Sequence, residues 1–217
     1  MRLYNKPTSD GNSFCGGTLI ASKYVISAAH CMFSYDNSGL ATAATTADLI
    51  AIRIGDHNLD LDGETSLTPK FVNVVKITNH PDYNQQIGQG SVINDGHDIT
   101  ILELEEDLDL NTYTPACLAK TTDSTTFDGK TATVAGWGHI ADGGPFPDPF
   151  VPHEVDIPVI ASADCKWSSS VPSIICAGLT EGGKDACQVR KLNIILSFLF
   201  QFRNNNILGH RVTVVDP

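Results

Sequence analysis

Two polar residues stand where a fold could bring them together for proton transfer. His30 lies in the small-residue segment Ala28-Ala29-His30-Cys31, and Asp98 immediately precedes the strand-like run 99–104. A histidine exchanges protons near neutral pH, and a buried carboxylate that accepts its ring N–H selects the tautomer and stabilises the imidazolium. Each residue alone has a simpler interpretation, because a lone histidine beside a disulfide cysteine is more often structural and an aspartate before a strand commonly forms a turn.

Short β-rich runs separated by turn signals must position these two residues. Apolar and polar side chains alternate most clearly over 99–104, and no segment longer than about 12 residues has a convincing helical period. This spacing predicts an all-β sandwich or barrel with little helix. The predicted strands are 17–27, 49–54, 71–78, 99–104, 131–136 and 154–160.

Charge and hydropathy exclude two classes of protein. The 217 residues include 14 Lys and Arg against 25 Asp and Glu, and the resulting net charge of −11 argues against nucleic-acid binding. No apolar run reaches the length of about 18 residues that a membrane-spanning helix needs, so a membrane-spanning protein is excluded. Residues 1–7 lack the apolar core and cleavage site of a secretory signal.

The cysteines indicate disulfides and not a metal site. None forms a C-x-x-C pair, and only Cys31 lies near a histidine in the sequence. They are therefore interpreted as disulfide formers from an oxidising compartment. The cysteines are Cys15, Cys31, Cys117, Cys165, Cys176 and Cys187.

A series of short motifs over residues 13–188 places His30 and Asp98 in a known context. The motifs are Cys15-Gly16-Gly17-Thr18-Leu19-Ile20, Ala28-Ala29-His30-Cys31, Ile54-Gly55-Asp56-His57-Asn58-Leu59, His80-Pro81-Asp82-Tyr83-Asn84, Asp98-Ile99-Thr100-Ile101-Leu102, Pro115-Ala116-Cys117-Leu118, Ala135-Gly136-Trp137-Gly138 and Ile175-Cys176-Ala177-Gly178. In these motifs and in their order, the chain resembles the trypsin-like serine proteases of the chymotrypsin fold, family S1.

The resemblance implies a double six-stranded antiparallel β-barrel with the active site in the cleft between the barrels. It makes His30 the general base and Asp98 its orienting carboxylate, with His97 where the family more often has Asn. It pairs Cys15 with Cys31 and Cys165 with Cys176. A bridge from Cys15 to Cys31 would close a loop of about 16 residues, which the chain-entropy model values at roughly 3 kcal/mol. Cys117 resembles the cysteine that often tethers an N-terminal pro-segment.

The resemblance also implies binding sites. Asp185 matches the floor of the primary specificity pocket, where a carboxylate pairs with an Arg or Lys side chain of a polypeptide substrate; without that context it would be a structural residue of a Gly-rich turn. Protein protease inhibitors are further expected partners. No cofactor is required. The acidic loop at 56–64 resembles the family's structural calcium site, although many relatives have such an acidic loop without bound metal. Its candidate ligands are Asp56, Asn58, Leu61, Asp62 and Glu64.

The pattern breaks after Gln188. The family continues Gly-Asp-Ser-Gly-Gly-Pro, which supplies the nucleophilic serine and the oxyanion-hole N–H groups, whereas this chain has Val189-Arg190-Lys191. The family's Ile-Val-Gly-Gly start is also missing, so we expect a chain truncated at both ends, with an incomplete second barrel and poor folding. Residues 1–188 are expected to form the partial protease domain. Residues 189–217 are expected to be translated non-coding sequence, a genuine divergent strand or helix being the alternative.

Three functions remain open on the sequence alone. The first is a secreted serine endopeptidase cleaving after Arg or Lys, whose sequence has lost its nucleophile through a splicing or gene-model error. The second is a non-catalytic protease homologue that regulates other proteases by binding. The third is a non-functional fragment. For the chain as written, without the serine, we expect no hydrolysis.

Overall fold

The computed structural model describes residues 1–6, 13–61, 65–89, 96–118, 127–138, 148–165 and 174–179, together with the backbone of three short strands between 201 and 214. The architecture is nearly all β, as predicted, and the helices named in the structure are short 3-10 turns. Among the described residues, no helix is long and apolar enough to cross a membrane.

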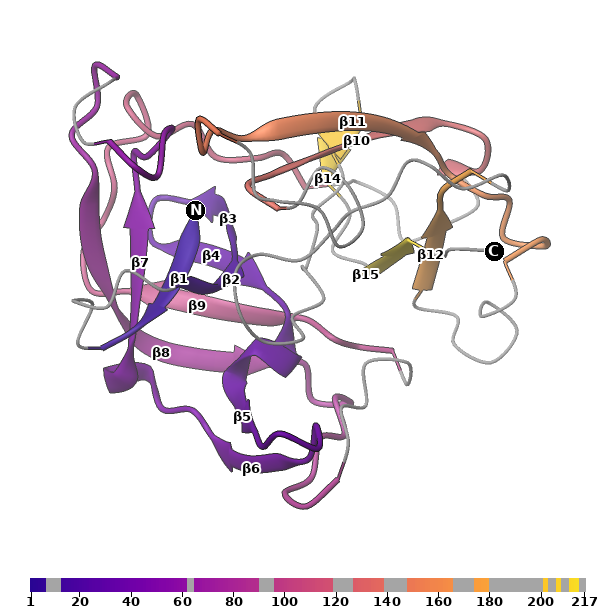
Figure 1. The fold of residues 1–217 in the computed structure, drawn as a ribbon, viewed down its shortest axis with the longest axis horizontal. Coiled ribbons are helices and arrows are strands. Elements are labelled where there is room, and N and C mark those ends of the chain that lie inside the picture. Colours follow the sequence, from indigo (N-terminus) through magenta and orange to yellow (C-terminus); the bar gives the residue numbers. More distant parts are fainter. Residues whose placement is uncertain are drawn as a thin grey trace.

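The N-terminal part is a nearly closed antiparallel barrel (Figure 1). Its seven-stranded sheet has the order β2-β1-β7-β8-β9-β4-β3. The two outer strands, β2 and β3, are consecutive in the chain and separated only by Gly17, so together they act as one bent strand that joins the sheet edges. The strands are β1 Arg2–Asn5, β2 Ser13–Gly16, β3 Thr18–Ala21, β4 Tyr24–Ser27, β7 Ile50–Ile54, β8 Lys70–Asn79 and β9 Thr100–Leu104.

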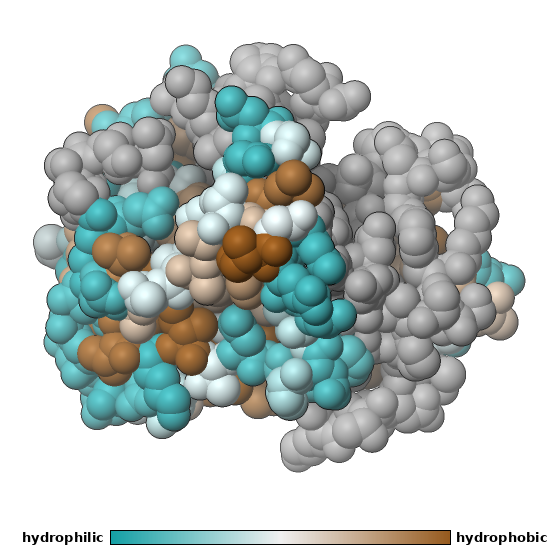
Figure 2. Space-filling model, turned by 90° about the horizontal axis from the view of Figure 1, so that it is seen from below, coloured by the Kyte–Doolittle hydropathy of each residue, from teal (hydrophilic) through white to brown (hydrophobic). Residues whose placement is uncertain are grey.

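Side-chain alternation explains why these segments close around a core. In β9, Thr100, Leu102 and Leu104 are buried, whereas Ile101 faces outward and is 39% exposed. Leu102 and Leu104 join a cluster of fully buried aliphatic side chains from β1, β4, β7 and β8. Burial of such side chains contributes roughly 1.5–3 kcal/mol each, so this cluster holds the barrel together. On the face in Figure 2, apolar surface lies in small groups separated by polar residues.

Gly17 is required at the bend because no side chain fits there. A Cβ built on Gly17 would lie 2.8 Å from Val25 Cγ1 and 3.1 Å from Leu3 Cδ1, both in fully buried residues. We expect Gly17→Ala to lower the free energy of unfolding by about 1–3 kcal/mol, the usual cost of overpacking. Urea titration of the wild type and the variant measures this. The cost should shrink in a Val25→Ala background, and an equal cost in both backgrounds would contradict the steric explanation.

Between β4 and β7 the chain makes a peripheral excursion. A 3-10 turn, η2, spans Ala29–Met32, and the hairpin β5 Phe33–Tyr35 with β6 Ala41–Ala44 follows it. A second 3-10 turn, η3 Ala47–Leu49, leads into β7. This excursion places His30 at the end of the barrel.

The C-terminal part is built from two smaller sheets. Strands β10 Thr131–Gly136 and β11 His153–Pro158 pair along their full length around buried Ala132, Val134 and Ile157. An isolated bridge joins Val159 to Ala177 in β12 Ile174–Ala177. The described strands of this part form two separate sheets, and the incompleteness of the second barrel stays a prediction.

Segments beyond Gln188 also pair with this part. β13 Gln201–Phe202 pairs antiparallel with β10 and with β14 Asn206–Ile207, and β15 Arg211–Val214 runs parallel to β12. The domain boundary at 188/189 and the non-coding origin of residues 189–217 stay predictions.

The structure differs from the predicted strands in several places, and the prediction did not include β1, β2, β5, β6 or β12. The run 17–27 contains two strands, β3 and β4, because the chain turns at Ser22 and Lys23. Strand β1 has no strand signal of its own in the sequence, and its pairing with both β2 and β7 places it in the sheet.

The acidic stretch at 105–109, which follows β9, ends in a turn that the Asp109 side chain stabilises. Its carboxylate accepts hydrogen bonds from Thr112 Oγ1 at 2.7 Å and from the Asn111 backbone N–H at 3.0 Å. The Thr112 bond and the Asn111 bond hold the pKa of Asp109 below its ordinary value. A depressed folded-state pKa means that the turn's stabilisation is present at neutral pH and is lost as pH falls through that pKa. NMR titration of the Asp109 carboxyl should show the low pKa in the wild type and a rise toward the ordinary value in Thr112→Val. An ordinary pKa in the wild type would contradict the capping geometry.

Candidate active site

The pairing of β4 with β9 brings His30 and Asp98 together. Ser27 at the end of β4 lies opposite Thr100 at the start of β9, so the residues just beyond each strand meet at the same end of the barrel. His30 follows in η2, and Asp98 precedes β9. His30 and Asp98 are 68 positions apart in the sequence, and the strand register makes them neighbours.

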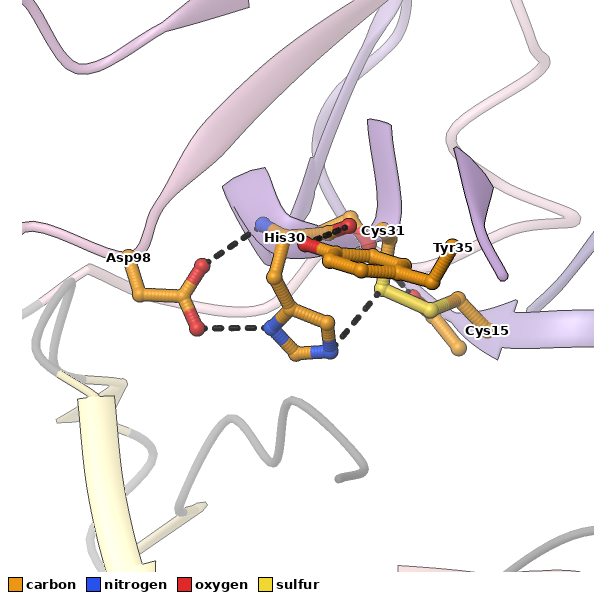
Figure 3. Close-up of a disulfide and its surroundings, with 7 residues drawn as sticks. Cys15, His30, Cys31, Tyr35 and Asp98 are labelled. Atoms are coloured by element: carbon orange, nitrogen blue, oxygen red, sulfur yellow. Dashed lines mark hydrogen bonds and ion pairs between the residues drawn. A yellow bond between two sulfur atoms is a disulfide. The ribbon is translucent and has the colours of Figure 1, made fainter. Parts of the chain in front are cut away.

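The contact is a double one. His30 Nδ1 lies 2.7 Å from Asp98 Oδ2, and the His30 backbone N–H donates to Asp98 Oδ1 at 2.8 Å (Figure 3). His30 and Asp98 are only 7% and 5% exposed. Hydrogen bonds to a carboxylate are strong in such a low-dielectric setting, so both the ring and the backbone of His30 are fixed.

This geometry defines what the pair can do chemically. When Nδ1–H donates to Asp98, the neutral imidazole keeps Nε2 as its basic nitrogen. Nε2 lies on the far side of the ring from Asp98, 3.7 Å from Cys31 Sγ. The pair can therefore accept a proton at Nε2 while the buried carboxylate stabilises the cation that forms.

Tyr35 is a supporting residue that sequence reasoning missed. Its hydroxyl lies 3.3 Å from the carbonyl oxygen of His30 and 3.3 Å from Gln85 Oε1. Tyr35 lies in β5, five residues beyond His30, and nothing in its sequence context distinguishes it from an ordinary strand tyrosine.

The two expected disulfides are present. Cys15 pairs with Cys31, next to His30, and Cys165 pairs with Cys176. Because their sulfurs are bonded to each other, Cys15 and Cys31 offer His30 no thiolate with which to share a metal. Cys117 is an exposed free cysteine.

The Cys15–Cys31 bridge should stabilise the part of the barrel that carries His30. Its sequence separation of 16 corresponds to about 3 kcal/mol in the chain-entropy model. We expect the double substitution Cys15→Ala/Cys31→Ala to lower the free energy of unfolding by about that amount in a urea titration. A double variant as stable as the wild type under oxidising conditions would contradict this contribution.

The candidate calcium residues are only partly described. Asp62 and Glu64 lie outside the described residues, as does Asp185 of the expected specificity pocket. Asp56 Oδ2 lies 2.9 Å from Arg53 Nε, so a guanidinium already neutralises this nearly buried carboxylate and would repel a calcium ion beside it. Asp56 therefore fits poorly as a calcium ligand, and calcium binding stays a prediction.

The same loop instead connects the two parts of the molecule. Trp137 Nε1 donates to the His57 carbonyl oxygen at 2.7 Å, and the Leu59 N–H donates to the Phe150 carbonyl oxygen at 3.0 Å. Asn58 is buried, and its side-chain oxygen accepts the Asp60 N–H at 3.0 Å, which shapes the turn. These contacts fix the barrel against the C-terminal sheets.

Comparison with known proteins agrees with this geometry. The family model described as Trypsin matches residues 3–189. The chain belongs to the trypsin family. It is 35% identical over 184 residues to the venom serine protease Bi-VSP of Bombus ignitus. It is 31% identical over 191 residues to trypsin-3 of Salmo salar, and 32% identical over 191 residues to a trypsin of Sus scrofa.

The alignments with these trypsin-family relatives cover a larger share of this chain than of the relatives' own lengths. The alignments include 80% of the chain for the Bombus ignitus protein and 85% for both trypsins. The chain spans 45% of the Bombus ignitus protein, 68% of the salmon trypsin and 70% of the pig trypsin. Family membership thus rests on the region that contains the His30–Asp98 pair.

Proposed function

We propose that the gene encodes a serine endopeptidase in which His30 is the general base and Asp98 orients it. The observation that carries this proposal is the buried double contact of Asp98 with the ring and backbone of His30. A structural histidine needs no basic nitrogen held in a defined tautomer, whereas proton abstraction from a nucleophile does.

We further infer that the substrate is a polypeptide with Arg or Lys at the cleaved bond. The support is chemical and comes from the sequence: Asp185 stands at the family's pocket position, and a carboxylate there pairs with a guanidinium or ammonium group. An extracellular location follows from the two disulfides, which persist in oxidising compartments.

The chain as written is proposed to be inactive. The sequence has Val189-Arg190-Lys191 where the family has the nucleophile and oxyanion donors, and it contains no Gly-x-Ser-x-Gly turn. This observation favours a second candidate function, a non-catalytic homologue that binds other proteases or their substrates. The two candidates differ in whether a message with the serine exists.

The endopeptidase proposal is tested on the protein encoded by a message that continues from Gln188 into Gly-Asp-Ser-Gly-Gly-Pro. We expect it to hydrolyse Arg and Lys esters far faster than a Phe ester, with activity abolished by His30→Ala. Asp185→Ser should remove the preference for Arg and Lys while leaving slow hydrolysis of the Phe ester. Activity that survives His30→Ala, or a preference unchanged by Asp185→Ser, would refute the assigned roles.

A further inference from the structure

A second cluster of chemically active side chains lies beside the His30–Asp98 pair. His80, Asp82 and His97 each offer a nitrogen or carboxylate oxygen, and these atoms all lie within 4.8 Å of one another. The imidazole rings of His80 and His97 are stacked, with centroids 4.5 Å apart and planes inclined by 19°. The proposed role of His30 and Asp98 uses none of these three side chains.

The strand register produces this cluster. Asn79 at the end of β8 lies opposite Thr100 at the start of β9, and the next pair continues the ladder because the His80 N–H donates to the Ile99 carbonyl oxygen at 2.9 Å. Beyond His80 the backbone that follows β8 turns, and the Tyr83 N–H donates to the His80 carbonyl oxygen at 3.0 Å. The turn brings Asp82 back toward His80.

Local backbone geometry orients two of the side chains. His97 has a φ of 55°, in the left-handed region where Asn, Asp and His are the most frequent residues with a side chain. The Asp82 backbone N–H donates to His80 Nδ1 at 3.2 Å, so Nδ1 of the neutral ring carries the lone pair and is the nitrogen that a cation can bind in place of this hydrogen bond. The same nitrogen lies 3.9 Å from Asp82 Oδ2. His80 is thus held in place before any ligand arrives.

We propose that His80, Asp82 and His97 form a binding site for a divalent transition-metal cation of the zinc type. Two imidazoles and one carboxylate are typical ligands of zinc, whereas calcium requires a larger set of oxygen ligands. Three protein ligands leave a fourth position for water, as in open zinc sites.

The distances and exposure suit such a cation. Ligand atoms of a tetrahedral zinc site lie about 3.3 Å apart, given metal–ligand bonds of about 2.0–2.1 Å. The ligand atoms of the three side chains, which lie within 4.8 Å of one another, would need to draw closer to reach this spacing. The side chains of His80 and Asp82 are 34% and 70% exposed, so a cation can reach them from solvent.

The location couples this site to the proposed general base. His97 is peptide-bonded to Asp98, whose two oxygens hold the ring and backbone of His30. A cation bound to the His97 side chain would restrain the backbone that positions this carboxylate. Metal binding itself is independent of the proposed proteolysis, because it requires no nucleophile.

The test is calorimetric titration of the purified full chain with zinc chloride, and with calcium chloride as a control cation. We expect one zinc ion to bind per chain and calcium not to compete with it. His80→Ala and, separately, His97→Asn should each weaken zinc binding by at least about tenfold. Asn tolerates the left-handed backbone, so the His97 variant removes the ligand without adding strain.

His153→Ala is the matched control, because His153 is an exposed histidine in β11 outside the cluster. It should bind zinc as the wild type does. Zinc affinity unchanged in both cluster variants, affinity lost equally in His153→Ala, or no zinc binding by the wild-type chain would each overturn the proposal.

Discussion

The purified 217-residue chain is expected to hydrolyse an arginine ester no faster than buffer does. Loss of the nucleophile or base from a serine protease triad lowers kcat by about 10⁶-fold, and only the oxyanion hole and substrate binding then sustain residual catalysis. This chain also lacks the Gly-Asp-Ser-Gly-Gly-Pro segment that supplies the oxyanion donors. His30 can accept a proton, but the sequence has no serine in the family's Gly-flanked turn to give one.

The assay compares the wild-type chain with His30→Ala and with an active trypsin at equal concentration. Equal background rates for the two versions of this chain are the expected result. Turnover by the wild type that His30→Ala abolishes would show that another residue serves as nucleophile. Such a result would overturn the proposed inactivity while supporting the role of His30.

Asp98→Ala is expected to lower the free energy of unfolding by about 2–5 kcal/mol. The substitution removes the acceptor for both the His30 backbone N–H and Nδ1 and leaves these groups buried without it. Asp98→Asn should cost less, because the amide oxygen can still accept one of the two bonds. Urea unfolding of the three proteins measures the difference.

Asp107→Ala is the matched control for this prediction. Its carboxylate is also hydrogen-bonded, to Ser22 Oγ at 2.6 Å, but it lies at the exposed surface. We expect a change within about 0.5 kcal/mol, as for most surface substitutions. An Asp98→Ala variant that is no less stable than Asp107→Ala would show that the buried double contact does not hold His30 in place.

Much of the fold was predictable from local pattern. The alternation in β9 and the apolar runs of β7, β8, β10 and β11 predicted their existence and approximate ends, because a half-buried strand imposes a period of two. Strand β1 was missed because four residues carry too little pattern. Only its neighbours in the sheet stabilise it as a strand.

In the candidate site too, some features were predictable from the sequence and others were not. His30 and Asp98 were predicted through the motifs around them, and the structure brings them together. The Arg53–Asp56 ion pair and the stacking of His80 on His97 were missed, because these contacts depend on side-chain direction and strand register. Sequence spacing alone places neither pair in contact.

The central claim is that this gene encodes a serine endopeptidase and that the present chain lacks its nucleophile. Deep sequencing of the transcript across the codon for Gln188, with the alternative junctions quantified, tests it most directly. We predict a dominant message that reads from Gln188 into Gly-Asp-Ser-Gly-Gly-Pro. A dominant message reading Val189-Arg190-Lys191 would contradict the endopeptidase assignment and leave a catalytically inactive member of the trypsin family.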